Sequence, residues 1–432
     1  MKIKIILWSL ISALVAGLVI GAFLWSRKPQ IITLSDGTKL TLIGVTYGHH
    51  HVAPKIKLAG ARSPRTGGAR LDSTNDTLVV WILQEHRPNQ WPNYQLLVYD
   101  RADTACVRTT TRTQTQIKNG TEIQGFMLGA YPRRDRKMVL HIMTYGQRGQ
   151  QMAKEQFVVA NPARGSFPKW TPSPLPDTKS DGDLDVTLKQ LVANAPAPYG
   201  RTGVAKNDPA NQCVQLDFDA QQNGQSATNW RPVQVETSDA TGNFIKGWVN
   251  NYWQNGEKAG YLFQSGLWPE EPAWKVRLEF SRTSGFDPDE LWSVTNVPVR
   301  AGGQQDAWNF WGNSNSGRAN PAFAETTING VRVKLFPAIQ YTDPNRNNTK
   351  VVSLTFKTDP DAESAGMRLT PLGATDDQGH AMNNQGSSWG GGDYQYEYAA
   401  PRNLQSVNIT IALHLSRFVE FTVKPQKAAA NP

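Results

Sequence analysis

The chain has 432 residues, about three times the length of a typical domain, which excludes a single small domain and favours three. With 36 Gly, 27 Pro and 14 Trp and no long helical apolar stripe in its body, the sequence excludes a mainly helical fold and predicts an all-β protein of short strands. The formal net charge is +9, and residues 31–170 hold 19 Lys and Arg against 9 Asp and Glu.

The first predicted element is an uncharged apolar segment from Ile5 to Trp25, about 21 residues long, which is enough to cross a bilayer as a helix. It leads directly into Ser26, Arg27 and Lys28 instead of a small-residue cleavage site, which favours an uncleaved anchor over a cleaved signal peptide. We expect a single-pass membrane protein whose body is extracytoplasmic, in the periplasm or at the cell surface.

Three small residues recur at every fourth position of this segment: Ala13, Gly17 and Gly21. Such spacing lets two membrane helices approach closely and predicts a homodimer contact. Small residues are also frequent in membrane helices generally, so the alternative of no dimer stays open.

Beyond the anchor, one alternating phrase occurs three times. The sequence WKVRLEFSR from Trp274 corresponds to NITIALHLSR from Asn408, and an earlier echo surrounds Met138. Each alternates apolar with other residues, as a strand with one buried face does. Other strand-like runs begin at Asp76, Cys213 and Val351 in the same order, each about 137 residues after the one before.

These repeats predict three tandem immunoglobulin-like β-sandwich modules, each with its own core. The expected boundaries are an anchor at 1–30, a basic module at 31–167, a Pro/Ser linker at 168–179, a Trp-rich module at 180–300, a Gly/Asn/Ser linker at 301–321, a third module at 322–427 and a disordered tail at 428–432.

Three phrases carry a resemblance: LSDGTKLTLIGVTYG after the anchor, GLWPEEPAWKVRLEFSRTSGFDPDELW in the middle and SRFVEFTV near the end. With these the chain resembles uncharacterised membrane-anchored multi-sandwich envelope proteins of verrucomicrobial and planctomycete-type bacteria. The resemblance spans most of the chain. It implies architecture and an envelope location, and no activity or catalytic residues.

Metal and catalytic motifs are weak. His49, His50 and His51 are adjacent, so on a strand they point to opposite faces and do not converge on one ion, and we expect a histidine run in a loop. The run from Asp181 to Asp185 lacks the Gly and Glu of a calcium loop. Nucleophile and phosphate-loop motifs are missing. We expect no catalytic, cofactor or metal site, although paired carboxylates of a hydrolase meet only in a fold.

Two further sets of residues are singled out by their positions in the predicted modules. His141, Glu279 and His414 occupy corresponding outward positions on the repeated strand and are expected to face solvent in three separate modules. Cys106 and Cys213 lie in the first two modules and could form a disulfide across their interface, or remain separate buried thiols.

The basic run PRRDRK is a candidate contact for lipid headgroups or an acidic polymer through Arg133, Arg134, Arg136 and Lys137, with a merely solvated basic face as the alternative. No nucleic-acid recognition motif is present, so nucleic acid is not an expected partner.

The middle module concentrates aromatic residues, and exposed indole rings stack against the apolar faces of sugars. Trp248, Trp253 and Trp268 are therefore candidate glycan-stacking residues, unless they belong to the core.

The sequence thus favours a non-enzymatic anchored protein for binding, adhesion or scaffolding, with the bilayer and a polysaccharide or envelope protein as partners. The alternatives are glycan binding by the Trp-rich module and a hydrolase with an unrecognised carboxylate site.

Overall fold

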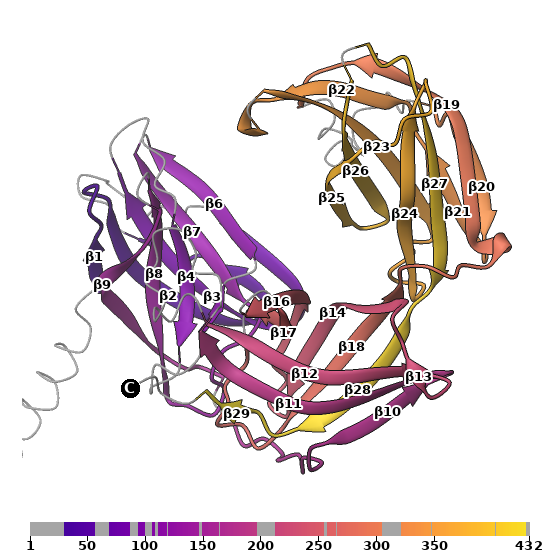
Figure 1. Cartoon of the computed structure of the whole chain (residues 1–432). Helices are drawn as coiled ribbons and strands as arrows, with labels where there is room; N and C mark the ends of the chain where they lie inside the picture. The colour runs from indigo at the N-terminus through magenta and orange to yellow at the C-terminus, as the bar shows by residue number, and fades with distance from the viewer. Residues whose placement is uncertain are drawn as a thin grey trace, which may run out of the picture.

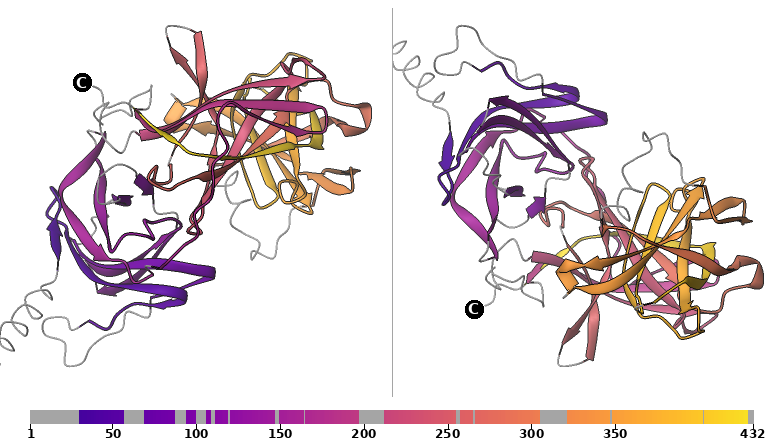
Figure 2. Two further views of the ribbon diagram at one scale, coloured as in Figure 1. Left: turned by 90° about the horizontal axis from the view of Figure 1, so that it is seen from below. Right: turned by 90° about the horizontal axis from the view of Figure 1, so that it is seen from above.

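The computed structural model describes residues 30–428, apart from 57–68, 87–93, 100–105, 109–110, 119, 147–148, 164, 197–211, 255–256, 265, 305–320, 347 and 402. Within these residues the protein is built from β-strands and short 3-10 turns, which confirms the all-β prediction. The strands form three two-sheet modules, and the second module lies between the first and the third (Figures 1 and 2).

The first module contains nine strands, the indigo and purple part of Figure 1. Its strands are β1 (Ile31–Thr33), β2 (Lys39–Val52), β3 (Arg70–Glu85), β4 (Tyr94–Tyr99), β5 (Cys106–Arg108), β6 (Thr111–Lys118), β7 (Thr121–Leu128), β8 (Lys137–Gly146) and β9 (Gly149–Ala160). One sheet has the order β1-β2-β3-β7-β6 and the other β5-β4-β8-β9. Alternating apolar residues of β3 and β8 fill the space between the sheets.

The second module has eleven strands. They are β10 (Asp177–Asp181), β11 (Leu184–Pro196), β12 (Gln212–Gln222), β13 (Gln225–Ser226), β14 (Trp230–Asp239), β15 (Phe244–Trp248), β16 (Asn250–Gln254), β17 (Glu257–Gln264), β18 (Trp274–Arg282) and, from the end of the chain, β28 (Arg417–Val423), with β29 (Gln426–Lys427) added beside β11. Its sheets have the orders β10-β11-β12-β17-β16 and β15-β14-β18-β28.

The third module also has two layers. Its strands are β19 (Leu291–Ala301), β20 (Ala324–Ile328), β21 (Val331–Leu335), β22 (Ala338–Asp343), β23 (Thr349–Asp359), β24 (Met367–Asp376), β25 (Asn384–Gly390), β26 (Asp393–Ala399) and β27 (Ser406–Leu415). Strand β23 pairs with β21, β22 and β26, while β27 pairs with β24 and β19. The end of β19 also pairs with β22 and so connects the two sheets.

The sheet orders repeat from module to module. The series β1-β2-β3-β7-β6 corresponds to β10-β11-β12-β17-β16 and to β20-β21-β23-β26-β25, and the central strands β8, β18 and β27 occupy the same place in the second sheet. The duplicated phrases at Trp274 and Asn408 therefore lie on equivalent strands. This equivalence supports the predicted repeat.

The turns that follow β14 and β24 have the same hydrogen-bond pattern. Asp239 and Asp376 each accept hydrogen bonds from backbone N–H groups two and four residues later, and Gly242 and Gly379 adopt φ values of +88° and +83°. A side chain would be strained at these left-handed positions, so glycine is favoured.

Modules two and three exchange their closing strands. In the first module β8 pairs with the next strand, β9. The strand after β18 is β19, yet β19 pairs with β27 of the third module, and the strand after β27, β28, pairs with β18. In Figure 1 the yellow β28 accordingly lies among the magenta strands. The expected boundaries at 180–300 and 322–427 assign β19 to the second module and β28 to the third, whereas the strand pairing does the reverse. The alternating pattern of a strand does not indicate which sheet the strand joins.

The apolar cores do not correspond one to one with the modules. One contiguous cluster extends through modules one and two, and a separate cluster fills module three. The expectation of one core for each module is therefore wrong for the first pair. Tyr131 of module one and Leu267 and Trp268 of module two are buried and belong to this joint cluster.

Candidate functional site at the module junctions

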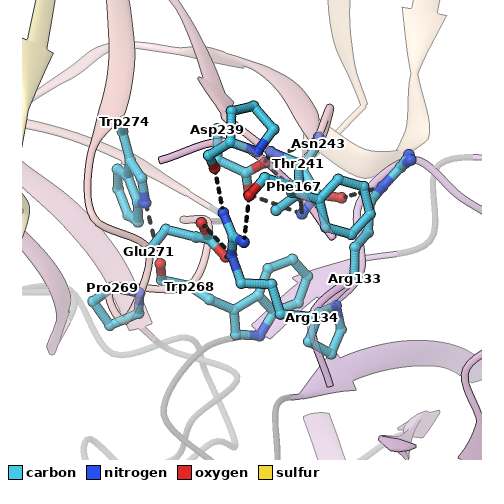
Figure 3. A network of polar contacts seen from close by, with 12 residues as sticks. Arg133, Arg134, Phe167, Asp239, Thr241, Asn243, Trp268, Pro269, Glu271 and Trp274 are labelled. Atoms are coloured by element: carbon cyan, nitrogen blue, oxygen red, sulfur yellow. Dashed lines mark hydrogen bonds and ion pairs between the residues drawn. The ribbon is translucent and has the colours of Figure 1, made fainter. Parts of the chain in front are cut away.

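The first junction is centred on the turn after β14 (Figure 3). Asp239 holds the turn by accepting bonds from Thr241 and Asn243. The carboxamide of Asn243 then pairs with the backbone of Tyr131: it accepts a bond from the Tyr131 N–H at 3.1 Å and donates one to the Tyr131 carbonyl at 2.9 Å. This two-bond contact imitates a strand pair and connects module two to the segment before β8.

A largely buried ion pair lies beside this turn. Arg134 Nε donates to both carboxylate oxygens of Glu271, at 2.8 and 3.0 Å, while its other nitrogens donate to the carbonyls of Phe167 and Pro168. Burial raises the pKa of Glu271, although Arg134 acts in the opposite direction. Arg134 thus connects module one, the linker and module two.

These contacts change the interpretation of the basic run. Arg133 donates to Asn243 Oδ1 at 3.1 Å, and Arg134 is bound to Glu271, so both belong to the junction. Arg136 and Lys137 are exposed. The four side chains therefore do not form the common polyanion surface that the sequence suggested, since two of them have acceptors within the protein.

The second junction is built around Arg368, near the start of β24. Its guanidinium contacts both oxygens of Glu279 on β18 at 2.7 Å and Oε1 of Glu363 at 2.6 Å. The side chains of Arg368 and Glu279 are each only 7% exposed. Burial alone would lower the pKa of Arg368, but hydrogen bonding and the charge of Glu279 outweigh it and raise the pKa. This pair connects modules two and three.

Equivalent positions of the repeated phrase meet across this junction. Ser281 on β18 lies 3.2 Å from Nε2 of His414 on β27, and Ser416 donates to Glu279 at 2.7 Å. Glu279 and His414 are buried. The expectation that they face solvent in separate modules is therefore wrong, because another module covers the face that points away from each strand's own core.

Burial also decides the charge state of His414. Its Nδ1 donates to the Leu415 carbonyl, since a carbonyl can only accept, and Nε2 is then the acceptor in the neutral ring. Desolvation lowers the pKa of His414 to about 4, with Arg282 and Arg368 contributing in the same direction. The imidazole is neutral at physiological pH.

The three candidate stacking residues have different surroundings. Trp268 is only 3% exposed and belongs to the core shared by modules one and two, so it cannot be a surface platform. The Trp253 side chain lies outside the described residues. Trp248 is 44% exposed and meets Trp389 of module three. Trp389 could not be identified as a neighbour of Trp248 from the sequence, because the two residues are about 140 positions apart in the chain.

The histidine run lies on β2 rather than in a loop. His51 is buried and bonded to Thr46 and Thr77, and burial lowers its pKa. His50 contacts Asp72 and His49 contacts Asp76. In the described part of the chain no three His, Cys, Asp or Glu side chains are grouped as metal ligands.

The aspartates at 181–185 anchor the returning strand. Asp181 accepts a bond from the Phe418 N–H at 2.7 Å, and both Asp181 and Asp183 lie near Arg417. Asp185 accepts a bond from Ser180 across the hairpin. The carboxylates of Asp181 and Asp183 thus fix the start of β28.

Cys213 is a free, buried thiol in this structure rather than half of a disulfide. Burial raises its pKa to about 12. The side chain of Cys106 lies outside the described residues.

No family model, curated protein or solved structure matches this chain. The predicted anchor from Ile5 to Trp25, with Ala13, Gly17 and Gly21, lies outside the described residues. Among the residues that are described, none form a helix of the length and apolarity that a bilayer crossing requires.

Proposed function

We propose that this chain is a non-enzymatic scaffold or adhesion protein that holds three modules in a fixed relation outside the cytoplasm. The observation that carries the proposal is the double connection between modules two and three, in which β18 leads into β19 and β27 leads into β28. A junction crossed by two strands and fixed by the buried Arg368–Glu279 pair resists bending far more than a single linker does.

The same ion pair argues against a hydrolase site at this junction. Glu279 and Glu363 are the carboxylates that approach each other here, and Arg368 binds both of them. A general acid or nucleophile needs a carboxyl group that faces a substrate. Two carboxylates held by one guanidinium fit a structural role better.

The immunoglobulin-like fold, the membrane anchor and its dimer contact are part of the same proposal. Repeated two-sheet modules of short antiparallel strands support an immunoglobulin-like description. The apolar segment from Ile5 to Trp25 supports a membrane anchor, with Ala13, Gly17 and Gly21 as its homodimer face. An anchored envelope protein is also what the resemblance of the three quoted phrases implies.

Glycan binding is the second candidate function, and one observation favours it. Trp248 remains 44% exposed although it is packed against Trp389, which is typical of an aromatic side chain available for stacking.

The location can be tested with reporters fused after Pro432. We expect alkaline phosphatase, which requires an oxidising compartment, to be active there, and deletion of residues 5–25 to remove the chain from the membrane fraction. A fused reporter active only in the cytoplasm would contradict the proposal, as would full membrane association of the deletion variant.

A further inference from the structure

An aromatic pair spans the second junction where two edge strands approach each other. Trp248 ends β15, and Trp389 is the penultimate residue of β25. Their ring centroids are 4.9 Å apart, with an angle of 77° between the ring planes. The pair therefore exists only when modules two and three are docked.

Trp248 also contacts a charged side chain that is itself held by two ion pairs. The Arg368 guanidinium lies 5.5 Å from the centre of the Trp248 ring, within the range of a cation–π contact. Arg368 is itself held by Glu279 and Glu363. The indole is thus oriented in advance, which lowers the entropic cost of binding a ligand.

Charged groups surround this aromatic surface. Lys246, on the same strand as Trp248, lies 3.7 Å from Glu363 and 4.0 Å from Glu236. Lys246 remains 42% exposed, so its ammonium group can also meet a ligand. A lipid or an apolar peptide would require apolar side chains in these places. A ligand with one apolar face and a rim of hydroxyl groups matches both the ring and its surroundings.

A gluco-configured pyranose has this chemistry, because its hydroxyl groups are equatorial and its axial C–H bonds form apolar faces. We propose that Trp248 and Trp389 form a subsite for one such residue of a β-linked polysaccharide, with Lys246 and Glu363 facing its hydroxyl rim. The inference rests on the second proposed function and adds the ligand class, the contribution of module three and the requirement for a docked junction.

The full-length chain in detergent can be titrated with cellohexaose, with binding followed by calorimetry and tryptophan fluorescence. Maltohexaose serves as the control ligand, because its α-linkages present a curved chain. We expect cellohexaose to bind more tightly than maltohexaose. Trp248→Ala should weaken binding about tenfold or more, as expected for loss of one stacking ring, and Trp389→Ala should weaken it several-fold.

Two further variants keep the result interpretable. Phe244→Ala removes another exposed aromatic residue from the same strand and should leave binding unchanged. Trp389→Phe keeps an aromatic ring at the junction and should retain most of the binding, which separates loss of the site from loss of the fold.

The outcomes distinguish the two levels of the proposal. If the unaltered chain binds no cellohexaose, both the subsite and the glycan-binding function are overturned for this ligand class. If binding persists in both Trp→Ala variants, the subsite is overturned while glycan binding stands. Equal loss of binding in Phe244→Ala would also contradict the subsite.

Discussion

Arg368 is the residue on which the second junction depends most. Removing its side chain leaves the buried Glu279 without its cation, while Glu363 keeps only Lys246. Breaking a buried ion pair from one side costs about 3–5 kcal/mol. We expect Arg368→Ala to lower the free energy of unfolding by this amount in equilibrium denaturation.

The exposed Arg332–Asp359 pair in the same module provides the control. Arg332→Ala should leave the free energy of unfolding nearly unchanged, as is usual for exposed surface pairs. Equal and small effects of the two substitutions would show that Arg368 does not hold the junction.

His414 makes the stability of this junction depend on pH. Its pKa is lowered to about 4 in the folded protein from an ordinary value of 6.5, so the unfolded chain binds the proton first as the pH falls. The stabilisation is complete above about pH 6.5 and is lost progressively toward about pH 4. We expect His414→Asn to flatten the decline of the unfolding free energy across this interval.

Carboxylates also titrate at the acid end of the interval, so a control is needed. His50→Asn alters an exposed histidine of module one and should leave the slope unchanged. An identical pH profile for His414→Asn and the unaltered chain would contradict a role for His414.

At the scale of elements, β28 is the strand that closes module two. Val419, Phe421 and Val423 of this strand are buried against β18 and its neighbours. Each such side chain contributes roughly 1.5–3 kcal/mol by burial. We expect a chain that ends after Ser416 to lose the cooperative unfolding of module two, measured by denaturation and by proteolysis.

A peptide covering residues 417–428 should restore that transition when it is added to the shortened chain. Phe421→Ala in the full chain should cost about 3–5 kcal/mol, as for other buried aromatic residues. A shortened chain that unfolds like the full one would show that β28 is dispensable.

The strands and their repeat could be predicted from the sequence, because alternation and spacing are local signals. Trp274 and Asn408 were assigned to equivalent strands, and the sheet orders support this assignment. The closing strands could not be assigned, since β19 and β28 both alternate and nothing local selects β27 or β18 as the partner.

Most of the candidate site could not be predicted for a related reason. Alternation shows that Glu279 and His414 point away from their own cores, but it does not show that a second module covers that face. The burial of Trp268 could not be predicted for the same reason. The sequence shows an aromatic residue, but its burial depends on the core that it shares with module one.

At the scale of the whole molecule, we propose that the two junctions hold the three modules in a fixed relation. The first junction combines a shared apolar core with the contacts of Asn243 and Arg134, and the second adds the exchanged strands. We expect Asn243→Ala combined with Arg134→Ala to loosen the junction between modules one and two, where the shared apolar core remains, while the junction between modules two and three is unchanged.

The most direct test of this account is an electron–electron distance measurement on the full chain, with spin labels at Lys39→Cys in module one and Thr327→Cys in module three. Cys106→Ser leaves Cys213 as the one remaining native cysteine. Cys213 is buried and its pKa is raised to about 12, so it should not react with the label. Fixed junctions predict one narrow distance distribution, which broadens when Asn243 and Arg134 are both replaced. A broad distribution in the chain that keeps Asn243 and Arg134 would contradict fixed junctions.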